Sequence, residues 1–192
     1  MDRILNGADA EAPWPWIVRI GIKSKDLHYC AGTLISDRYV LTAEHCFSHI
    51  TEMNPNDTTD LLRDTFLTFG DFEEGSKTFE VTPKKIFFRA NRYEKNGLIT
   101  NDLEPDLALL QIPSLKNRKI GNSVVKAACL PDEPVAPGTQ CWVAGWGYTS
   151  REDLMSQDFS KLPQKLQEAP MHKLSAEYCR DYSELNIVEK KR

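Results

Sequence analysis

The amino-acid sequence predicts an all-β fold built from a pair of barrels. Short runs rich in valine, isoleucine, phenylalanine and threonine recur along the 192 residues, and turn-forming residues separate them. One stretch has the pattern of a helix start, with Ser175 as its N-cap. Many short strands with little helix are typical of barrels, and a chain of this length buries enough surface for a sizeable core.

The predicted strands begin after an irregular lead-in, in which Pro13 and Pro15 lack the amide proton that a sheet ladder needs. The polar stretch 51–64 is predicted to be a surface loop. It contains an N-glycosylation acceptor pattern at Asn56, which is usable only if the chain is secreted. Strand-like runs in this half of the chain cover residues 17–23, 28–36, 38–42, 66–69 and 77–88.

The second half continues with a polar stretch, 91–105, that is predicted to be a loop. Asp106 then opens the apolar run 106–112. An aspartate at the mouth of a buried strand must be paired or hydrogen-bonded, and a turn residue that caps the strand is the alternative interpretation. A linker is predicted at 113–126, and further strands are predicted at 141–147 and 165–174.

Composition and charge exclude several classes of protein. The net charge is −4, and the basic residues are scattered apart from the short run 190–192, so we expect no nucleic-acid partner. No apolar run approaches the roughly 20 residues that cross a bilayer, so no membrane span is expected. The start, Met1-Asp2-Arg3, does not resemble a signal peptide.

The cysteines indicate a redox compartment. None belongs to a Cys-x-x-Cys pair, so neither a zinc ribbon nor a thioredoxin-like site is expected. Wide spacing is typical of disulfides in a secreted protein. Their odd number predicts that at least one has no partner within this chain. The five are Cys30, Cys46, Cys129, Cys141 and Cys179.

The stretch 41–46, Leu-Thr-Ala-Glu-His-Cys, carries the clearest chemical signal. An apolar run breaks into a polar turn that presents His45 and ends on Cys46. If Cys30 and Cys46 are bonded, the imidazole is held beside a covalent cross-link, and a general base requires such a fixed position. From this stretch alone, a catalytic base and a buried histidine beside a structural cysteine both remain open.

Together these stretches resemble the chymotrypsin/trypsin family of serine proteases. The resemblance covers nearly the whole chain, and the motifs occur in the order of the family. The segments that carry it are Arg3-Ile4-Leu5-Asn6-Gly7, Pro13-Trp14-Pro15-Trp16, Cys30-Ala31-Gly32-Thr33-Leu34-Ile35, Leu41-Thr42-Ala43-Glu44-His45-Cys46, Asp106-Leu107-Ala108-Leu109-Leu110, Ala128-Cys129-Leu130-Pro131 and Gly145-Trp146-Gly147.

The resemblance implies a chymotrypsin-like double β-barrel. Residues 1–3 are then the remnant of a propeptide, residues 4–126 form a complete N-terminal barrel with an activation-type N-terminus, and residues 127–192 form a partial C-terminal barrel. We expect the partial barrel to expose apolar, unpaired strand edges around Val143 and Leu166. The isolated chain is therefore expected to be poorly soluble or to need a partner.

The resemblance also implies roles for individual residues. His45 is the general base and then the general acid, and Asp106 orients it and stabilises the imidazolium. Asp102 is a rival carboxylate, but Asp106 alone adjoins the apolar run. Activation cleavage falls between Arg3 and Ile4.

The family pattern also pairs the cysteines. A Cys30–Cys46 disulfide closes a loop of about 15 residues, which is worth roughly 3 kcal/mol on the chain-entropy model. The family partner of Cys129 lies upstream in a propeptide. Those of Cys141 and Cys179 lie downstream of this chain.

Two departures from the family stand out. No Gly-Asp-Ser-Gly-Gly segment, which carries the family's nucleophile, occurs in the 192 residues, and Ser156 and Ser160 lie in polar sequence without flanking glycines. We therefore expect an incomplete, inactive form of a protease. Glu44 stands where the family usually has alanine; near Asp106 it would repel that carboxylate, and pointing to solvent it would matter little.

The expected function is trypsin-like serine endopeptidase by family, with this chain inactive alone. The alternative is a non-catalytic, protease-derived binding or regulatory module. Expected partners are protein or peptide substrates, protease inhibitors and a propeptide linked through Cys129, and the expected location is extracellular. No resident metal or cofactor is expected, because His45 and His49 lack a third ligand. Calcium is a weaker expectation at Asp71, Glu73, Glu74 and Glu80.

Overall fold

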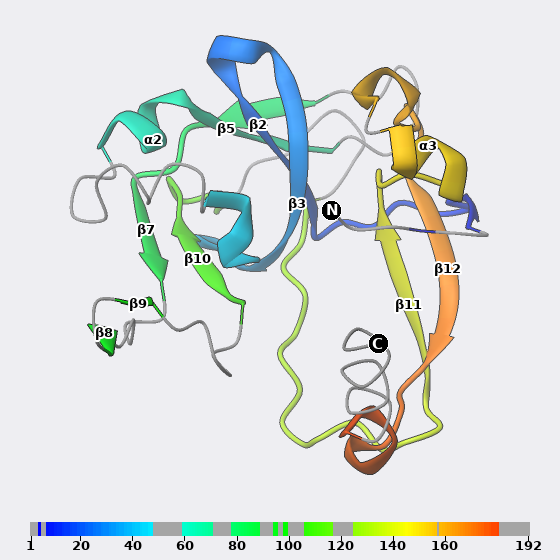
Figure 1. The fold of residues 1–192 in the computed structure, drawn as a ribbon. Helices are drawn as coiled ribbons and strands as arrows, with labels where there is room; N and C mark the ends of the chain where they lie inside the picture. The colour runs from blue at the N-terminus through cyan, green and yellow to red at the C-terminus, as the bar shows by residue number, and fades with distance from the viewer. Residues whose placement is uncertain are drawn as a thin grey trace.

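The computed structural model describes residues 4, 7–47, 59–70, 78–88, 94–95, 98–99, 106–116, 125–156 and 158–180. Within these residues the chain forms antiparallel sheets and only short helices, so the all-β prediction is confirmed. Figure 1 shows the two larger sheets, one around β2 and β3 and the other containing β11 and β12.

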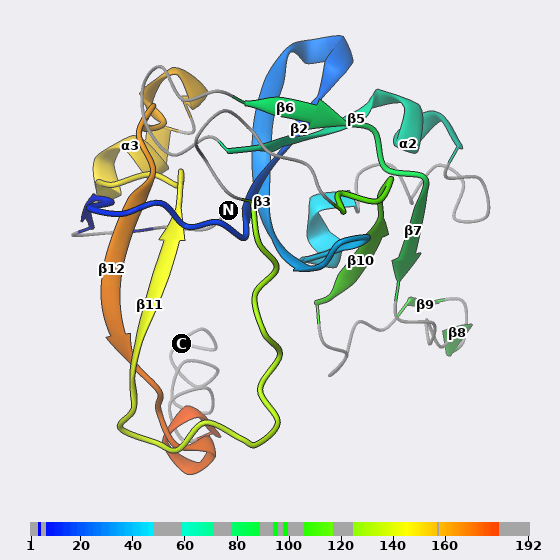
Figure 2. The ribbon, with the colours of Figure 1, turned by 180° about the vertical axis from the view of Figure 1, so that it is seen from behind.

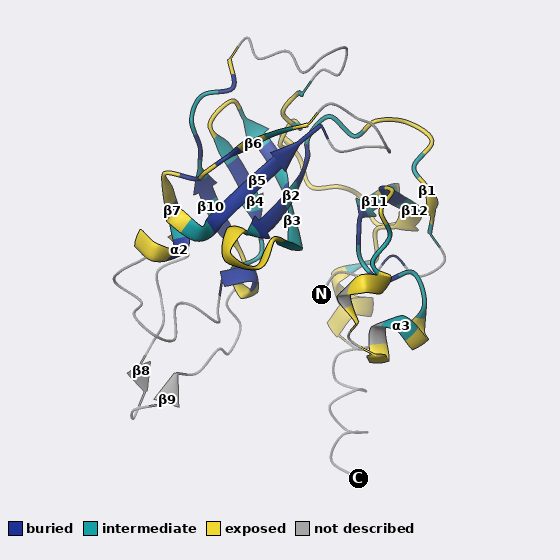
Figure 3. Ribbon diagram, turned by 90° about the horizontal axis from the view of Figure 1, so that it is seen from above, coloured by how far each residue is buried: buried dark blue, intermediate teal, exposed yellow. Residues whose placement is uncertain are grey.

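The larger sheet has seven strands and curls around a core. Its edge strands, β6 and β7, are separated in the chain only by residues 82–84, so a short connection links the two ends of the sheet. Figure 3 shows this sheet from above, with many buried residues (dark blue) in its strands. The strands in spatial order are β6 (Phe79–Val81), β5 (Thr65–Phe69), β2 (Ile17–Ile22), β3 (Leu27–Ser36), β4 (Tyr39–Thr42), β10 (Ala108–Gln111) and β7 (Lys85–Phe88).

Alternation of side chains along these strands produces the core. In β10, Ala108 and Leu110 are buried, whereas Leu109 and Gln111 are only half-buried, because successive residues point to opposite faces. The inner face collects aliphatic side chains from most strands of the sheet. Fully buried members of this core are Val18, Ile20, Leu34, Val40, Leu67, Phe69 and Leu110.

The second sheet has three described strands, in the order β1 (Ala8–Asp9), β12 (Gln167–His172) and β11 (Gln140–Gly145). β1 comes from the start of the chain, and Ala8 pairs with Glu168. In Figure 2 the N-terminal segment leaves the first sheet and crosses β11 to reach β12. β1 belongs to the residues 4–126 that the sequence analysis assigns to the first barrel, and it pairs with β12 of the second sheet, whereas Trp16 packs against the core of the first sheet.

The helices are short. They are α2 (Thr59–Asp64), α3 (Arg151–Ser156) and the 3₁₀ turns η1 (Lys23–Lys25), η2 (Glu44–Phe47) and η3 (Phe159–Lys161). A further helical stretch occupies 176–180. Its Tyr178 N–H donates to Ser175 Oγ at 3.1 Å, which confirms Ser175 as the N-cap. No helix among the described residues is long and apolar enough to span a membrane.

Two stretches predicted as loops contain regular structure. The polar stretch 51–64 ends in α2, because Leu61 is buried and its carbonyl accepts a hydrogen bond from Thr65 Oγ1 at 2.7 Å. The predicted loop 91–105 contains β8 (Glu94–Lys95) and β9 (Leu98–Ile99), which pair with each other. Both elements were missed because their stretches are polar in composition.

The predicted strand 77–88 is two strands, β6 and β7, because Pro83 between them has no amide proton for a ladder. The expectation of exposed apolar edges is correct for Val143, since β11 is an edge strand among the described residues. It is wrong for Leu166, which is 1% exposed and packs with Ile17 and Trp146.

Candidate active site

The local fold fixes His45 within the η2 turn, directly after β4. The Thr42 hydroxyl, at the end of β4, is buried and donates to the Ala31 carbonyl of β3 at 2.8 Å. The Cys30–Cys46 disulfide then ties the turn to β3 across a Cα–Cα distance of 6.2 Å. The predicted disulfide is therefore present, and it follows His45 directly.

Strand pairing delivers Asp106 to the same place. β10 pairs with β4 so that Ala108 lies opposite Thr42, and Asp106 precedes Ala108 by two residues. The backbone N–H of His45 donates to Asp106 Oδ1 at 2.8 Å. The ring atom Nδ1 of His45 lies 2.5 Å from Asp106 Oδ2, so both carboxylate oxygens contact one residue.

The Asp106 carboxylate is held in its ionised form. Partial burial is the largest single influence and opposes ionisation, although 53% of the side chain is exposed. Hydrogen bonds from the His45 ring and the His45 amide, attraction to His45, and a hydrogen bond from the Glu44 amide together outweigh it. The pKa of the Asp106 carboxyl therefore lies below its ordinary value.

This arrangement suits proton transfer. An ionised carboxylate that accepts a hydrogen bond from Nδ1–H holds the proton on that nitrogen, so that Nε2 is the basic nitrogen of the neutral ring. The His45 side chain is 44% exposed, so a reacting group can approach it from solvent. The pair can therefore orient a base and stabilise the imidazolium that forms when that base takes a proton.

A family model described as Trypsin matches residues 4–190, which is nearly the whole chain. The chain belongs to the trypsin family. Membership establishes the serine-protease class of hydrolases, with protein substrates, and agrees with the chymotrypsin-like double-barrel fold. The fold class and the family resemblance that the sequence predicts are thus confirmed.

Of the other residues predicted to have a role, some lie among the described residues and some do not. Ile4 is buried against the second sheet. Arg3, Asn56, Asp102 and the acidic residues of 71–77 lie outside the described residues. Free thiols occur at exposed Cys129 and Cys179 and at half-buried Cys141.

The two serines considered from the sequence make local contacts. Ser156 Oγ donates to the Asp153 carbonyl at 2.6 Å, and Ser160 Oγ donates to Asp158 Oδ1 at 2.7 Å. Both hydroxyls thus make local hydrogen bonds at short helical turns. Neither makes the contact with His45 that a nucleophile needs.

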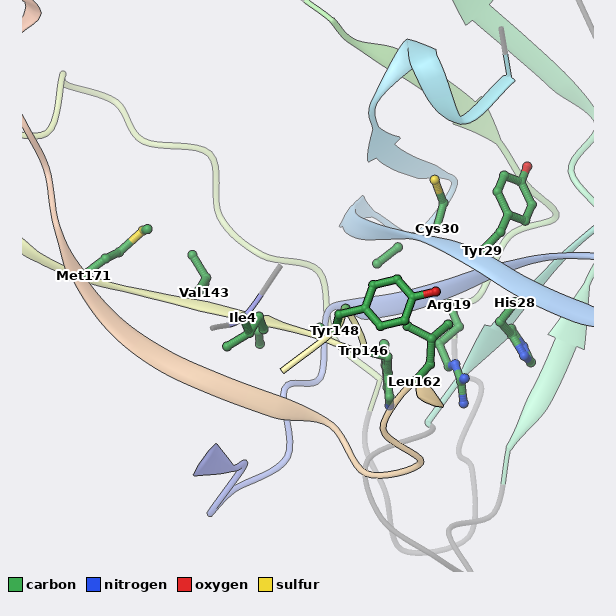
Figure 4. A pocket seen from close by; sticks show the side chains of 14 residues that line it. Ile4, Arg19, His28, Tyr29, Cys30, Val143, Trp146, Tyr148, Leu162 and Met171 are labelled. Atoms are coloured by element: carbon green, nitrogen blue, oxygen red, sulfur yellow. The ribbon is translucent and has the colours of Figure 1, made fainter. Parts of the chain in front are cut away.

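Two cavities lie between the sheets. One, of about 450 Å³, reaches Asp106 and is also lined by Leu107 and Trp142. The other, of about 360 Å³, extends from Cys30 on β3 to Met171 on β12. Figure 4 shows this second cavity. The first is lined by Asp106 and by Thr42 and Ala43, which precede the η2 turn.

Sequence reasoning missed the backbone donors of the site. The Glu44 and His45 amides both serve the Asp106 carboxylate. Only the register of β4 against β10, which brings the η2 turn next to Asp106, could have indicated these amide donors. Among the described residues, Cys30, His45 and Cys46 bring potential metal-ligating atoms within 4.8 Å of one another, but the two cysteines are joined in a disulfide.

Proposed function

We propose that this chain carries the base and orienting carboxylate of a trypsin-like serine endopeptidase. In this proposal, His45 takes the proton of an attacking hydroxyl at Nε2 and later returns it to the leaving amine. Asp106 holds Nδ1–H and offsets the positive charge of the imidazolium. The observation that carries the proposal is the 2.5 Å contact between His45 Nδ1 and Asp106 Oδ2.

The proposal includes a limit on this chain. Its 192 residues contain no Gly-Asp-Ser-Gly-Gly segment. Without a nucleophile, the imidazole has no hydroxyl to activate, so these residues alone form no acyl-enzyme.

A labelling experiment tests this limit. The purified chain is incubated with a fluorophosphonate probe and with peptide esters, beside an active serine protease as positive control. We expect no labelled serine and no ester hydrolysis above the buffer rate. Labelling at any serine, located by peptide mass spectrometry, would overturn the proposed inactivity.

The orienting role has its own readout. A proton held between His45 Nδ1 and Asp106 is strongly deshielded in the ¹H NMR spectrum. We expect such a signal in the parent protein and its loss in Asp106→Asn and in His45→Gln. Asp102→Asn is the matched control, and loss of the signal in that variant alone would move the role to the rival carboxylate.

The alternative function is a non-catalytic binding or regulatory module derived from a protease. The absent Gly-Asp-Ser-Gly-Gly segment and the acidic Glu44 beside His45 favour it. A transcript that continues past the Arg192 codon and encodes the missing segment would support the endopeptidase. Transcripts that all end at that codon would support the module.

Secretion fits the family, the Cys30–Cys46 disulfide and the acceptor pattern at Asn56. We propose an extracellular location on this basis. Expression in mammalian cells behind a secretion leader, followed by glycosidase digestion, tests the use of Asn56. An unchanged mass after digestion would exclude that site. Activation at Arg3–Ile4, inhibitor binding, the Cys129 link and calcium binding remain expectations from the family.

A further inference from the structure

We propose that the 360 Å³ cavity between the two larger sheets binds a small, uncharged aromatic molecule that carries a carbonyl oxygen. The volume is ample, since a cavity of about 150 Å³ already holds benzene. Figure 4 shows the side chains around the cavity. Neither His45 nor Asp106 is among the described residues that line it, so the proposal goes beyond the proposed function.

Two polar side chains in the wall of this cavity have no hydrogen-bond partner within the part of the chain that the structure describes. They are Trp146, which is 8% exposed, and Tyr148, which is 0% exposed. In Figure 4 the Tyr148 oxygen points toward the wall that Arg19 and Cys30 of the first sheet form. Buried polar groups without partners are costly and rare in folded proteins, so these two groups indicate a place where a ligand supplies the missing contact.

A third hydroxyl of this kind, that of Tyr29, belongs to a different environment. Tyr29 also lines the cavity, but its side chain packs against the core of the first sheet. In Figure 4 its oxygen points away from Tyr148. Burial, and then the negative charge of Asp64, raise the pKa of Tyr29. We therefore assign the ligand contacts to Trp146 and Tyr148 alone.

The two groups select the chemistry of the ligand. An indole N–H can only donate a hydrogen bond, and a phenol hydroxyl can donate one, so a ligand oxygen must accept. Burial, and then the negative charges of Asp158 and Asp153, raise the pKa of Tyr148, so its hydroxyl keeps its proton. The same carboxylates disfavour an anion, and a cation has no lone pair for either donor. A carbonyl oxygen is uncharged and can accept from either one.

The rest of the wall favours an aromatic body. Apolar side chains from both ends of the chain line the cavity, among them Ile4, Val143 and Leu162. The Arg19 guanidinium lies 4.9 Å from the centroid of the Trp146 ring and helps to hold that ring in place. A mostly apolar wall with a few directed polar groups is typical of small-molecule sites, and aromatic rings pack favourably against one another.

Three naphthalene probes test the chemical class. 2-Acetylnaphthalene carries the carbonyl oxygen, 2-ethylnaphthalene has nearly the same shape without it, and 2-naphthoate is an anion. Binding is followed by the indole signals of the four tryptophans in ¹H–¹⁵N NMR spectra, in which Trp146→Phe identifies the Trp146 signal by its loss. We expect 2-acetylnaphthalene to shift that signal saturably and to bind at least about threefold more tightly than the other two probes. No saturable shift, or equal or tighter binding of either other probe, would overturn the proposal.

A conservative variant tests the hydrogen bond itself. Tyr148→Phe keeps the ring and removes the hydroxyl, so it should weaken 2-acetylnaphthalene by about threefold to tenfold and leave 2-ethylnaphthalene unchanged. Tyr178→Phe is the matched control, because Tyr178 is 55% exposed and does not line the cavity. Equal weakening of both probes by Tyr148→Phe, or no weakening of either, would contradict the assigned contact.

The stability of the unliganded protein separates a binding role from a structural one. The Tyr148 hydroxyl has no described partner to lose, so Tyr148→Phe should unfold in urea at the same concentration as the parent or at a higher one. A lower midpoint would show that the hydroxyl serves the fold, and it would count against the proposed site.

Discussion

The Asp106 carboxylate depends on the backbone as much as on the imidazole. One oxygen accepts the His45 amide at 2.8 Å and the other faces the His45 ring. A second amide, from Glu44, also serves it. Glu44 therefore supports Asp106 through its main chain, whatever its side chain contributes. Such backbone donors survive any side-chain substitution at position 44 except proline.

The titration of Asp106 follows from these contacts. Its pKa in the folded state lies below the ordinary value of 3.8. The ionised carboxylate thus stabilises the fold above about pH 3.8, and this contribution is lost as the pH falls through the lower folded pKa. The effect on stability is small because the side chain is half exposed.

A carboxyl ¹³C NMR titration checks this prediction. The Asp106 midpoint should lie below 3.8 in the parent protein and move upward in His45→Gln, which loses the imidazole but keeps the amide. An identical Asp106 midpoint in both proteins would contradict the role of the His45 ring.

At the scale of an element, β10 links the core to the site. Leu110 is fully buried, whereas its neighbour Leu109 lies on the opposite, half-buried face. The same strand begins two residues after Asp106. A cavity created by truncating Leu110 should therefore make the position of the Asp106 carboxylate less fixed, as well as destabilise the core.

We predict that Leu110→Ala lowers the free energy of unfolding by about 2–5 kcal/mol, the range for a large aliphatic side chain lost from a core. Leu109→Ala, the matched control, should cost only about 1 kcal/mol because less apolar area is lost. Urea unfolding followed by tryptophan fluorescence measures both. Equal losses would show that the burial pattern of β10 is wrong.

The N-terminal segment is a second element with a testable anchor. Glu168 on β12 accepts the Trp14 indole N–H at 2.7 Å and the Glu11 amide at 3.3 Å. Glu168→Ala leaves the part-buried indole without this acceptor and should cost about 1–3 kcal/mol in local stability. Glu168→Gln keeps an acceptor oxygen and should cost less. Hydrogen exchange of the Ala10 amide, which donates to Leu166, reports the difference.

Strand periodicity made most of the first sheet predictable. The runs 17–23, 28–36 and 38–42 correspond to β2, β3 and β4 within one residue at each end, because β-branched and aliphatic residues dominate them. His45 and Asp106 were selected as the predicted base and orienting carboxylate because their motifs occur in family order. Their pairing through β4 and β10 was consistent with Asp106 at the start of an apolar run.

The features that the sequence could not indicate are mostly long-range strand pairings and hydrogen bonds from the main chain. β1 pairs with β12, which is far away in the chain. Because β1 is only two residues long, its sequence carries no periodic signal. α2 was missed because a single buried residue, Leu61, marks its inner face. The amides that serve Asp106 are common to all residues except proline, so no side-chain pattern reveals them.

At the scale of the whole molecule, the second sheet leaves apolar side chains in contact with solvent. Trp142 on β11 is 49% exposed, and Met171 on β12 and Leu107 near the site are similarly open. Trp142 and Leu107 line the same cavity between the sheets. We therefore predict that the isolated chain self-associates through this region.

Sedimentation velocity over a range of concentrations tests the association. Trp142→Lys should weaken it by at least about tenfold, since one large apolar contact is worth roughly 1.5–3 kcal/mol. Met155→Lys is the matched control, because Met155 on α3 is also exposed but does not line either cavity. A monodisperse parent that melts cooperatively would contradict the prediction.

The pairing of the N-terminal segment with β12 has a consequence for biosynthesis. Trp14 and Glu168 are 154 residues apart. At about 5–20 residues per second, a ribosome needs roughly 8–30 seconds to deliver the partner of that indole after the indole itself. Throughout this interval the nascent chain presents an unprotected tryptophan next to a sheet that can already form. The segment around Trp14 is therefore made well before β12 and finds its partner strand only after the intervening residues have been synthesised.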